Sequence, residues 1–119
     1  MAKVLKDEIN SQYYERYEKT NILLAKAEED VVIFKYGLEA LERRLMKKHD
    51  DDFRANNNGK ALPEYLQRRE AKADPQYMSA VRALAKASSL KTLYRGQLAK
   101  MDKEFDEWRT RSADRRGSL

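Results

Sequence analysis

A heptad repeat of apolar side chains runs through the first half of the chain, and it restricts the possible folds more than any other feature. Between about residues 6 and 49 the sequence has no proline and one glycine, Gly37. This stretch predicts one long α-helix with a single apolar seam, of the kind found in coiled coils. The seam residues recur every seven positions in two interleaved series, which are Tyr17, Leu24, Val31, Leu38 and Leu45, and Thr20, Ala27, Phe34 and Leu41.

Two packing arrangements fit this first helix. Leu23, Val32 and Ile33 widen the seam, so we expect it to contact more than one neighbouring helix. A plain amphipathic helix inside a compact bundle has the same spacing as a helix of an intermolecular coiled coil. Both arrangements stay open on the sequence alone.

A polar segment separates this helix from the second half of the chain. Residues 50–62 are rich in Asp and Asn, and Asn58-Gly59 favours positive φ, which predicts a linker. Because proline is tolerated in a first helical turn, we predict a short helix at about 63–72. Asp74 followed by Pro75 is typical of a helix N-cap and first helical position.

The last helix is predicted at about 75–112, with a frayed tail at 113–119. The side chains of its seam are small in the early part and bulky in the late part. This predicts that a neighbouring helix approaches closely at first and has to offer a wider groove further along. We therefore expect a single all-α domain over 1–119, built as a long antiparallel helical hairpin with a short connecting helix and coiled-coil-like packing. The seam residues are Tyr77, Leu84, Lys91, Leu98 and Phe105, interleaved with Ala80, Ala87, Tyr94, Met101 and Trp108.

Self-association is expected, because a lone hairpin leaves part of each seam in contact with water. Burying both seams requires helices from other copies of the chain. The residues expected at this oligomer interface are Leu24, Val31, Phe34, Leu38, Leu98, Met101, Phe105 and Trp108.

The composition excludes several classes of protein. Regularly spaced hydrophobic residues make up 41% of the chain, which argues against disorder despite a charged fraction of 38%. The absence of cysteine excludes disulfides and Cys-ligated zinc. The longest apolar runs have about four residues, far too few to span a membrane, so we expect no membrane partner. The first eight residues have no apolar stretch of a signal peptide, and we expect a cytoplasmic location.

Residues suited to catalysis or metal binding do not form a recognisable pattern. His49 precedes three aspartates, but neighbouring helical residues point in different directions, so a hydrated helix end is expected rather than a metal site. Carboxylates alternate with Lys and Arg, as on a solvated helix face. Glycine-rich phosphate loops, nucleophile elbows and zinc-binding helices are absent from the sequence. We expect neither an enzyme nor a bound metal or cofactor.

Basic residues gather at the end of the first helix and on the short helix. The macrodipole of a helix favours cations near its C-terminus, which gives the first cluster a structural explanation. In an antiparallel hairpin the two clusters lie toward the same end, and phosphate attraction grows with the number of cations engaged. The residues predicted to bind single-stranded nucleic acid are Arg43, Arg44, Lys47, Lys48, Arg68, Arg69 and Lys72.

Aromatic residues near these cations offer stacking surfaces for unpaired bases. Phe53 and Tyr65 accompany the two clusters. Tyr13, Tyr14 and Tyr17, beside Arg16, form a second and weaker candidate surface. Each of these tyrosines also suits a packing role.

In its layout the chain resembles the UvsY-like phage recombination mediators. Residues 41–45, Leu-Glu-Arg-Arg-Leu, look like the basic element which that family uses for single-stranded DNA. Residues 74–116 resemble the closing helix of related small phage proteins. The resemblance implies a ring-like homo-oligomer in the host cytoplasm that binds single-stranded DNA during phage recombination and replication. It also implies a recombinase and a single-strand-binding protein as partners, the first being loaded while the second is displaced.

The heptad seam alone also supports a different function. A helical protein-interaction or structural module, such as a virion component, an adaptor or an inhibitor of a host protein, needs no nucleic acid. In that case the basic patches serve only solubility.

Overall fold

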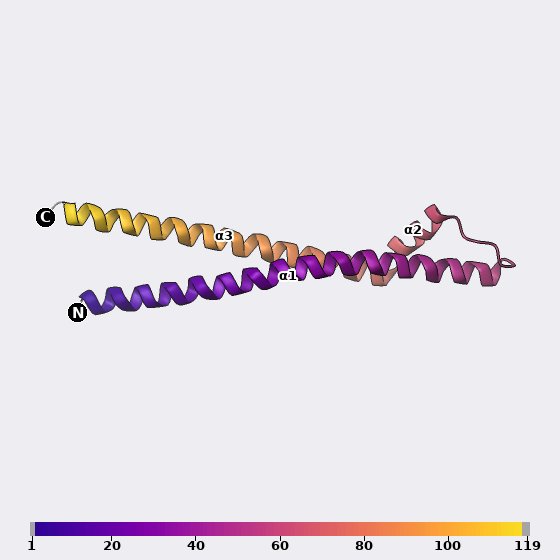
Figure 1. Ribbon diagram of the computed structural model, residues 1–119, viewed down its shortest axis with the longest axis horizontal. Helices are drawn as coiled ribbons and strands as arrows, with labels where there is room; N and C mark the ends of the chain where they lie inside the picture. Colours follow the sequence, from indigo (N-terminus) through magenta and orange to yellow (C-terminus); the bar gives the residue numbers. More distant parts are fainter. Residues whose placement is uncertain (1, 118–119) are drawn as a thin grey trace. The chain divides into compact units, whose positions relative to one another are not determined.

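The computed structural model describes residues 2–117, and the side chains discussed below are those of residues 11–112. It contains helix α1 (Ala2–Asn56), helix α2 (Glu64–Ala73) and helix α3 (Pro75–Gly117), in that order along the chain (Figure 1). No residue between 2 and 117 lies in a β-strand. The predicted all-α class is therefore confirmed.

The chain divides into two compact units, and both long helices contribute to each. The central unit comprises Glu28–Ser88, and the terminal unit comprises Met1–Ala27 together with Ser89–Leu119. The boundaries fall inside α1 and α3, where the helical backbone is continuous.

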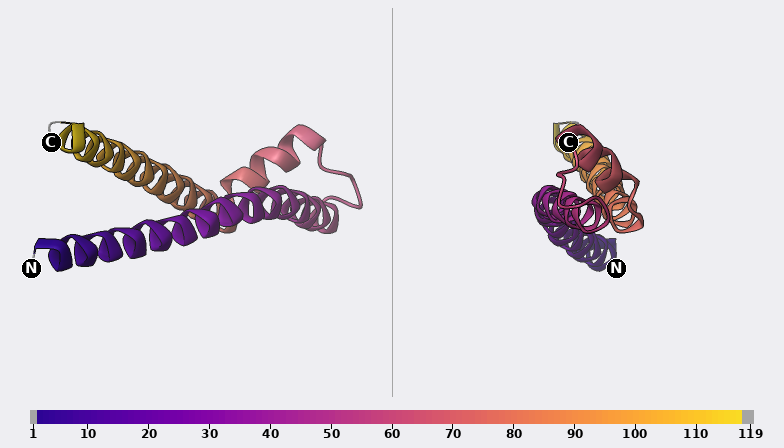
Figure 2. Two further views of the ribbon diagram at one scale, coloured as in Figure 1. Left: turned by 60° about the vertical axis from the view of Figure 1, so that its left-hand side comes forward. Right: turned by 90° about the vertical axis from the view of Figure 1, so that its right-hand side faces the viewer.

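The central unit has a small core to which every helix contributes. Leu45 of α1 is 1% exposed, Ala71 of α2 is fully buried, and Ala87 of α3 and Leu62 of the linker are also buried. Figures 1 and 2 show α2 beside the C-terminal part of α1. Because alanine has a short side chain, Ala71 lets the backbone of α2 approach its neighbours closely.

Helix α1 ends later than predicted, at Asn56 instead of about residue 49. Asp50 forms an ion pair with Arg54 one turn later (Nε–Oδ2, 3.0 Å), which fits a helical continuation. The helix ends where Asn58 and Gly59 adopt positive φ angles of 56° and 77°. The Gly59 amide then donates a hydrogen bond to the Arg54 carbonyl at 2.9 Å. This bond supplies a partner for a carbonyl group of the last helical turn. The predicted start of the linker at residue 50 is therefore wrong. The predicted positive φ angles at Asn58 and Gly59 are confirmed.

The junction between α2 and α3 matches its prediction closely. Helix α2 begins after Pro63, and α3 begins at Pro75. The Oδ1 atom of Asp74 accepts a hydrogen bond from the Gln76 amide at 2.9 Å, as expected of an N-cap aspartate. Residues 113–117, predicted to fray, continue α3, and residues 118–119 of the predicted tail lie outside the described residues.

In the terminal unit, the beginning of α1 contacts the end of α3, and the contacts run in opposite directions along the two segments. Tyr13 lies against Met101 and Phe105, whereas Thr20 and Leu23 share a cavity with Gln97 and Met101. The buried side chains of this unit are Thr20, Ala27 and Leu98. The hydroxyl group of Thr20 donates to the Arg16 carbonyl at 2.8 Å, so the buried polar group is satisfied within its own helix.

Burial along both long helices follows the predicted heptad positions. Nearly every seam residue is buried or half-buried, and the exceptions are Phe34 and Trp108, which are 37% and 43% exposed. Of the three residues expected to widen the seam, Leu23 is half-buried, whereas Val32 and Ile33 are 53% and 54% exposed. Within this chain the seam is therefore narrower than predicted. No stretch of the described helices is long and apolar enough to cross a membrane.

Candidate nucleic-acid interface

All seven basic residues predicted to bind nucleic acid lie in the central unit with exposed side chains. Four are on α1 and three are on α2. An exposed cation can reach a phosphate without the cost of uncovering it, so each meets the first requirement of the prediction.

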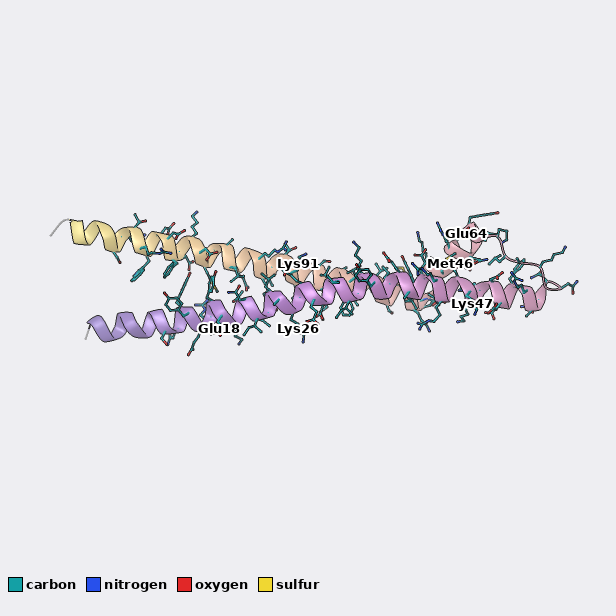
Figure 3. The ribbon with its side chains drawn as sticks, viewed as in Figure 1. Glu18, Lys26, Met46, Lys47, Glu64 and Lys91 are labelled. Atoms are coloured by element: carbon teal, nitrogen blue, oxygen red, sulfur yellow. The ribbon has the colours of Figure 1, made fainter. Side chains whose placement is uncertain are left out.

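The four cations of α1 form two rows rather than one patch. Arg43 and Lys47 are one turn apart, as are Arg44 and Lys48, and the two rows are offset by one residue. Figure 3 shows Met46 on the side of α1 toward α2 and Lys47 on the opposite side. Lys48 contributes to the lowered pKa of Asp74, which places this cation near the α2–α3 junction.

Helix α2 carries three exposed cations beside an exposed aromatic ring. Tyr65 is 71% exposed, and Arg69 follows it by one turn on the same side of the helix. Arg68 and Lys72 form a neighbouring row, while the opposite side of the helix packs through the buried Ala71. We name Tyr65, Arg68, Arg69 and Lys72 the α2 basic face.

One cation of the α2 basic face has an acidic partner. The Nη2 atom of Arg68 lies 3.1 Å from Oε1 of Glu64, and both side chains are largely exposed. An exposed ion pair of this kind contributes about 0–1 kcal/mol, so a phosphate group can compete for the arginine.

Phe53 differs from Tyr65 in its surroundings. It is half-buried and lines a cavity of about 370 Å³ together with Leu62, Leu66 and His49. Its ring is part of the packing between α1, the linker and α2, so it is unavailable for stacking on a base in this conformation. Tyr65 is the aromatic residue of the two that remains free to stack.

The central unit as a whole is nearly neutral. It contains twelve Lys and Arg residues against eleven Asp and Glu, whereas the terminal unit contains thirteen against nine. Two acidic residues of the central unit already have partners within the protein. Asp50 accepts a hydrogen bond from the Leu62 amide at 2.8 Å and forms an ion pair with Arg54, and Asp74 caps α3. Attraction for a polyanion in this unit therefore depends on local patches such as the α2 basic face.

His49 does not lie at a helix end as predicted, because α1 continues past it. Its Nε2 atom is 3.4 Å from Oδ2 of Asp74, and the imidazole is half-buried. The pKa of Asp74 is lowered, first by the hydrogen bond from the Gln76 amide and further by His49 and Lys48. Over the described residues, no three His, Cys, Asp or Glu side chains group together as metal ligands would.

The tyrosines of the terminal unit form an aromatic cluster with α3. The Tyr13 and Phe105 rings stack with centroids 5.9 Å apart, and Phe105 and Trp108 stack at 6.0 Å. The guanidinium group of Arg109 lies 4.6 Å from the centre of the Phe105 ring. This arrangement matches the packing role that the sequence left open for Tyr13.

The charge around this cluster opposes phosphate binding. Desolvation raises the pKa of Tyr13, and the carboxylates of Glu104, Asp102 and Asp106 raise it further. A hydrogen bond to Asp102 likewise raises the pKa of Tyr17. The carboxylates of Asp102, Glu104 and Asp106 near these rings would repel a phosphate group, so we regard the cluster as less suited to nucleic acid than the α2 basic face.

The residues predicted at an oligomer interface are mostly covered by their own chain. Leu98 is buried, and five others are half-buried. Phe34 and Trp108 are the two that remain exposed. Contact between copies through these residues stays a prediction. The half-buried five are Leu24, Val31, Leu38, Met101 and Phe105.

The structure thus defines an all-helical protein with exposed basic and exposed apolar helix faces. No protein-family model, curated protein or solved structure matches this chain.

Proposed function

We propose that this chain binds single-stranded nucleic acid through the α2 basic face, with Arg43, Arg44, Lys47 and Lys48 as further phosphate contacts, and that it acts without catalysing a reaction. The observation that carries the proposal is the exposure of Tyr65 beside Arg68, Arg69 and Lys72. Cations neutralise the phosphates of a single strand, and an accessible aromatic ring stacks on an unpaired base.

This binding mode is insensitive to base sequence. Every base has a face on which tyrosine can stack, and phosphates are the same at every step of the strand. Affinity is expected to fall as salt concentration rises, because bound cations release the counterions condensed on the strand.

The biological role that fits such binding is that of a recombination mediator acting as a coiled-coil-like homo-oligomer in phage recombination. This part of the proposal rests on the resemblance of residues 41–45 and 74–116 to the UvsY-like mediators. In that role the protein also contacts a recombinase or a single-strand-binding protein.

Fluorescence anisotropy with a labelled oligothymidine tests the binding surface. Tyr65→Ala is expected to weaken binding by roughly 5- to 150-fold, because loss of the aromatic partner of one stacked base costs about 1–3 kcal/mol. Arg69→Glu is expected to weaken it as well. The matched control is Lys86→Glu, which makes the same charge change at an exposed position of α3 in the same unit.

The comparison between Arg69→Glu and Lys86→Glu separates a local site from general charge attraction. Equal losses of affinity in these two variants would contradict the α2 basic face as the binding site. Undetectable binding of the unmodified protein at low salt would contradict nucleic-acid binding altogether.

A second function, that of a protein-interaction module without a nucleic-acid role, is favoured by two observations. Val32, Ile33 and Tyr36 expose large apolar surfaces on α1, and the central unit is nearly neutral. A stoichiometric protein partner that stays bound after nuclease treatment, together with a failed oligonucleotide assay, would favour this function.

A further inference from the structure

A row of exposed residues runs along α1 on the side away from its seam. Within the central unit, Val32, Ile33 and Tyr36 are 53%, 54% and 68% exposed. Large apolar side chains that adjoin one another on a helix surface mark an interaction site more often than isolated ones do. This side of α1 is not covered by α2 or α3.

Two side chains of opposite charge lie at equal distances on either side of Tyr36. Glu29 lies seven residues before Tyr36 and Arg43 lies seven residues after it, so heptad spacing puts all three on one line of the helix. Both charged side chains are exposed, and neither has an ion-pair partner among the described side chains. Each lies about 10 Å from Tyr36 along the axis, at 1.5 Å per residue.

We infer that this surface binds a second copy of the chain, with the two α1 helices antiparallel and related by a twofold axis at Tyr36. The surface, which we name the Tyr36 face, consists of Glu29, Val32, Ile33, Tyr36, Ala40 and Arg43.

The twofold operation makes the Tyr36 face complementary to itself. It places Tyr36 against its symmetry mate and Glu29 opposite Arg43 of the partner, and this ion pair forms twice. Val32 then faces Ala40 of the partner, because each is four residues from the axis. A large residue opposite a small one allows the helices to interdigitate.

Charge complementarity selects a second copy in this orientation over a parallel one. A parallel pair would set Glu29 against Glu29 and Arg43 against Arg43, and like charges at these positions repel. An unrelated partner would need a basic, an aromatic and an acidic side chain at matching positions. A second copy of this chain in the antiparallel orientation already has them.

The resulting dimer is expected to be weak. Only three large apolar side chains lie on each copy of the Tyr36 face, which places the contact among the small, transient interfaces below about 1,200 Å². The inference does not depend on nucleic-acid binding. Arg43 is nevertheless also proposed as a phosphate contact. It cannot pair with Glu29 of a second copy and with a phosphate group at the same time.

Sedimentation velocity without nucleic acid tests the ion pairs. Glu29→Arg and Arg43→Glu each turn the two Glu29–Arg43 ion pairs of the dimer into contacts between like charges. Each substitution is expected to weaken the dimer by about tenfold. Combining the two substitutions restores opposite charges across the axis and is expected to restore dimerisation. Circular dichroism checks that every variant stays helical.

Failure of the combined variant to regain what each single variant loses would overturn the pairing of Glu29 with Arg43. A strictly monomeric unmodified protein at concentrations of hundreds of micromolar would overturn the Tyr36 face as a self-association surface. Neither result bears on the oligonucleotide assay, so nucleic-acid binding through the α2 basic face and self-association through the Tyr36 face fail independently of one another.

Cross-linking with a short bismaleimide tests the orientation, and the absence of cysteine from the chain makes the experiment clean. Tyr36→Cys is expected to give covalent dimers, because the axis passes through this position. Glu29→Cys alone is expected to stay monomeric, since two copies of position 29 would lie about 21 Å apart. A mixture of Glu29→Cys and Arg43→Cys is expected to link. The control is Ser79→Cys, at an exposed position of α3.

Dimers formed by Glu29→Cys alone would show a parallel arrangement and contradict the inference. Linking by Ser79→Cys to the same extent as by Tyr36→Cys would show collision without a specific surface, and would contradict it too.

Discussion

Asp74 connects three parts of the central unit through its carboxylate and its backbone amide. It caps the first turn of α3, it lies 3.4 Å from His49 of α1, and its backbone amide donates to the Ala71 carbonyl at the end of α2. The cap was predictable from Asp74-Pro75, because both residues act on their own helix. The contact with His49 was not, because the two residues are 25 positions apart and no local pattern links them.

The pKa of Asp74 makes the stability of the central unit depend on pH in the acid range. Because folding lowers this pKa from its usual 3.8, the stabilisation is fully present above that value and is lost as pH falls through the lower folded value. Asp74→Asn keeps a capping side chain but removes the charge, so we expect its unfolding midpoint to vary less with pH below about 4. Thermal unfolding followed by circular dichroism at several pH values measures this. Equal acid sensitivity in Asp74→Asn and the unmodified protein would contradict it.

Gly59 and Gly96 are expected to respond oppositely to alanine. A Cβ atom added at Gly96 meets nothing within 4 Å, and this glycine lies inside α3, so Gly96→Ala is expected to stabilise the fold by about 1 kcal/mol. Gly59 has a φ of +77°, so Gly59→Ala is expected to destabilise it by about 1 kcal/mol. Urea unfolding measures both changes. The same sign for the two substitutions would contradict the assigned backbone conformations.

At the scale of the element, the sequence predicted which helices form better than where they end. Heptad spacing identified the seams of α1 and α3, because the side that packs is set by periodicity. The end of α1 was misplaced at the first polar residues. Asp50 and Arg54 stabilise a further helical turn through their ion pair, and the helix stops only where the backbone turns left-handed at Asn58.

Leucines on α1 and α3 should differ in importance according to their burial. Leu45 is 1% exposed in the central core, so Leu45→Ala is expected to cost about 2–5 kcal/mol of unfolding free energy through lost contacts and a cavity. Leu93 is half exposed, and Leu93→Ala is expected to cost less than about 1 kcal/mol. Denaturant unfolding of the two variants gives the comparison. Similar costs would contradict the placement of the core at Leu45.

At the scale of the whole molecule, the sequence indicated that the chain exposes more apolar surface than it can cover. It placed this surface on the seams, through residues such as Leu24 and Leu98. In the structure most of the seam is occupied by intramolecular contacts, and an uncovered cluster lies across α1 at Val32, Ile33 and Tyr36. The sequence pattern assigned Val32 and Ile33 to a widened seam, because periodicity identifies one preferred side of a helix. Only the fold shows that they lie with Tyr36 on a separate, exposed side of α1.

The division of charge between the two units also emerges only from the fold. The formal net charge of +5 is a property of the sequence, but the central unit holds little of it. The proposed nucleic-acid binding by this unit therefore rests on the exposed residues of α2 rather than on overall charge.

The salt dependence of oligothymidine binding by the unmodified protein tests the central claim most directly. For single strands the slope of log K against log salt is about −0.7 per phosphate contacted, so the three cations of the α2 basic face predict about −2 and all seven cations predict about −5. A slope in this range, reduced by about 0.7 in Arg69→Glu and unchanged in Lys86→Glu, is the expected result. Binding that is absent at low salt, or that does not vary with salt, would contradict the claim.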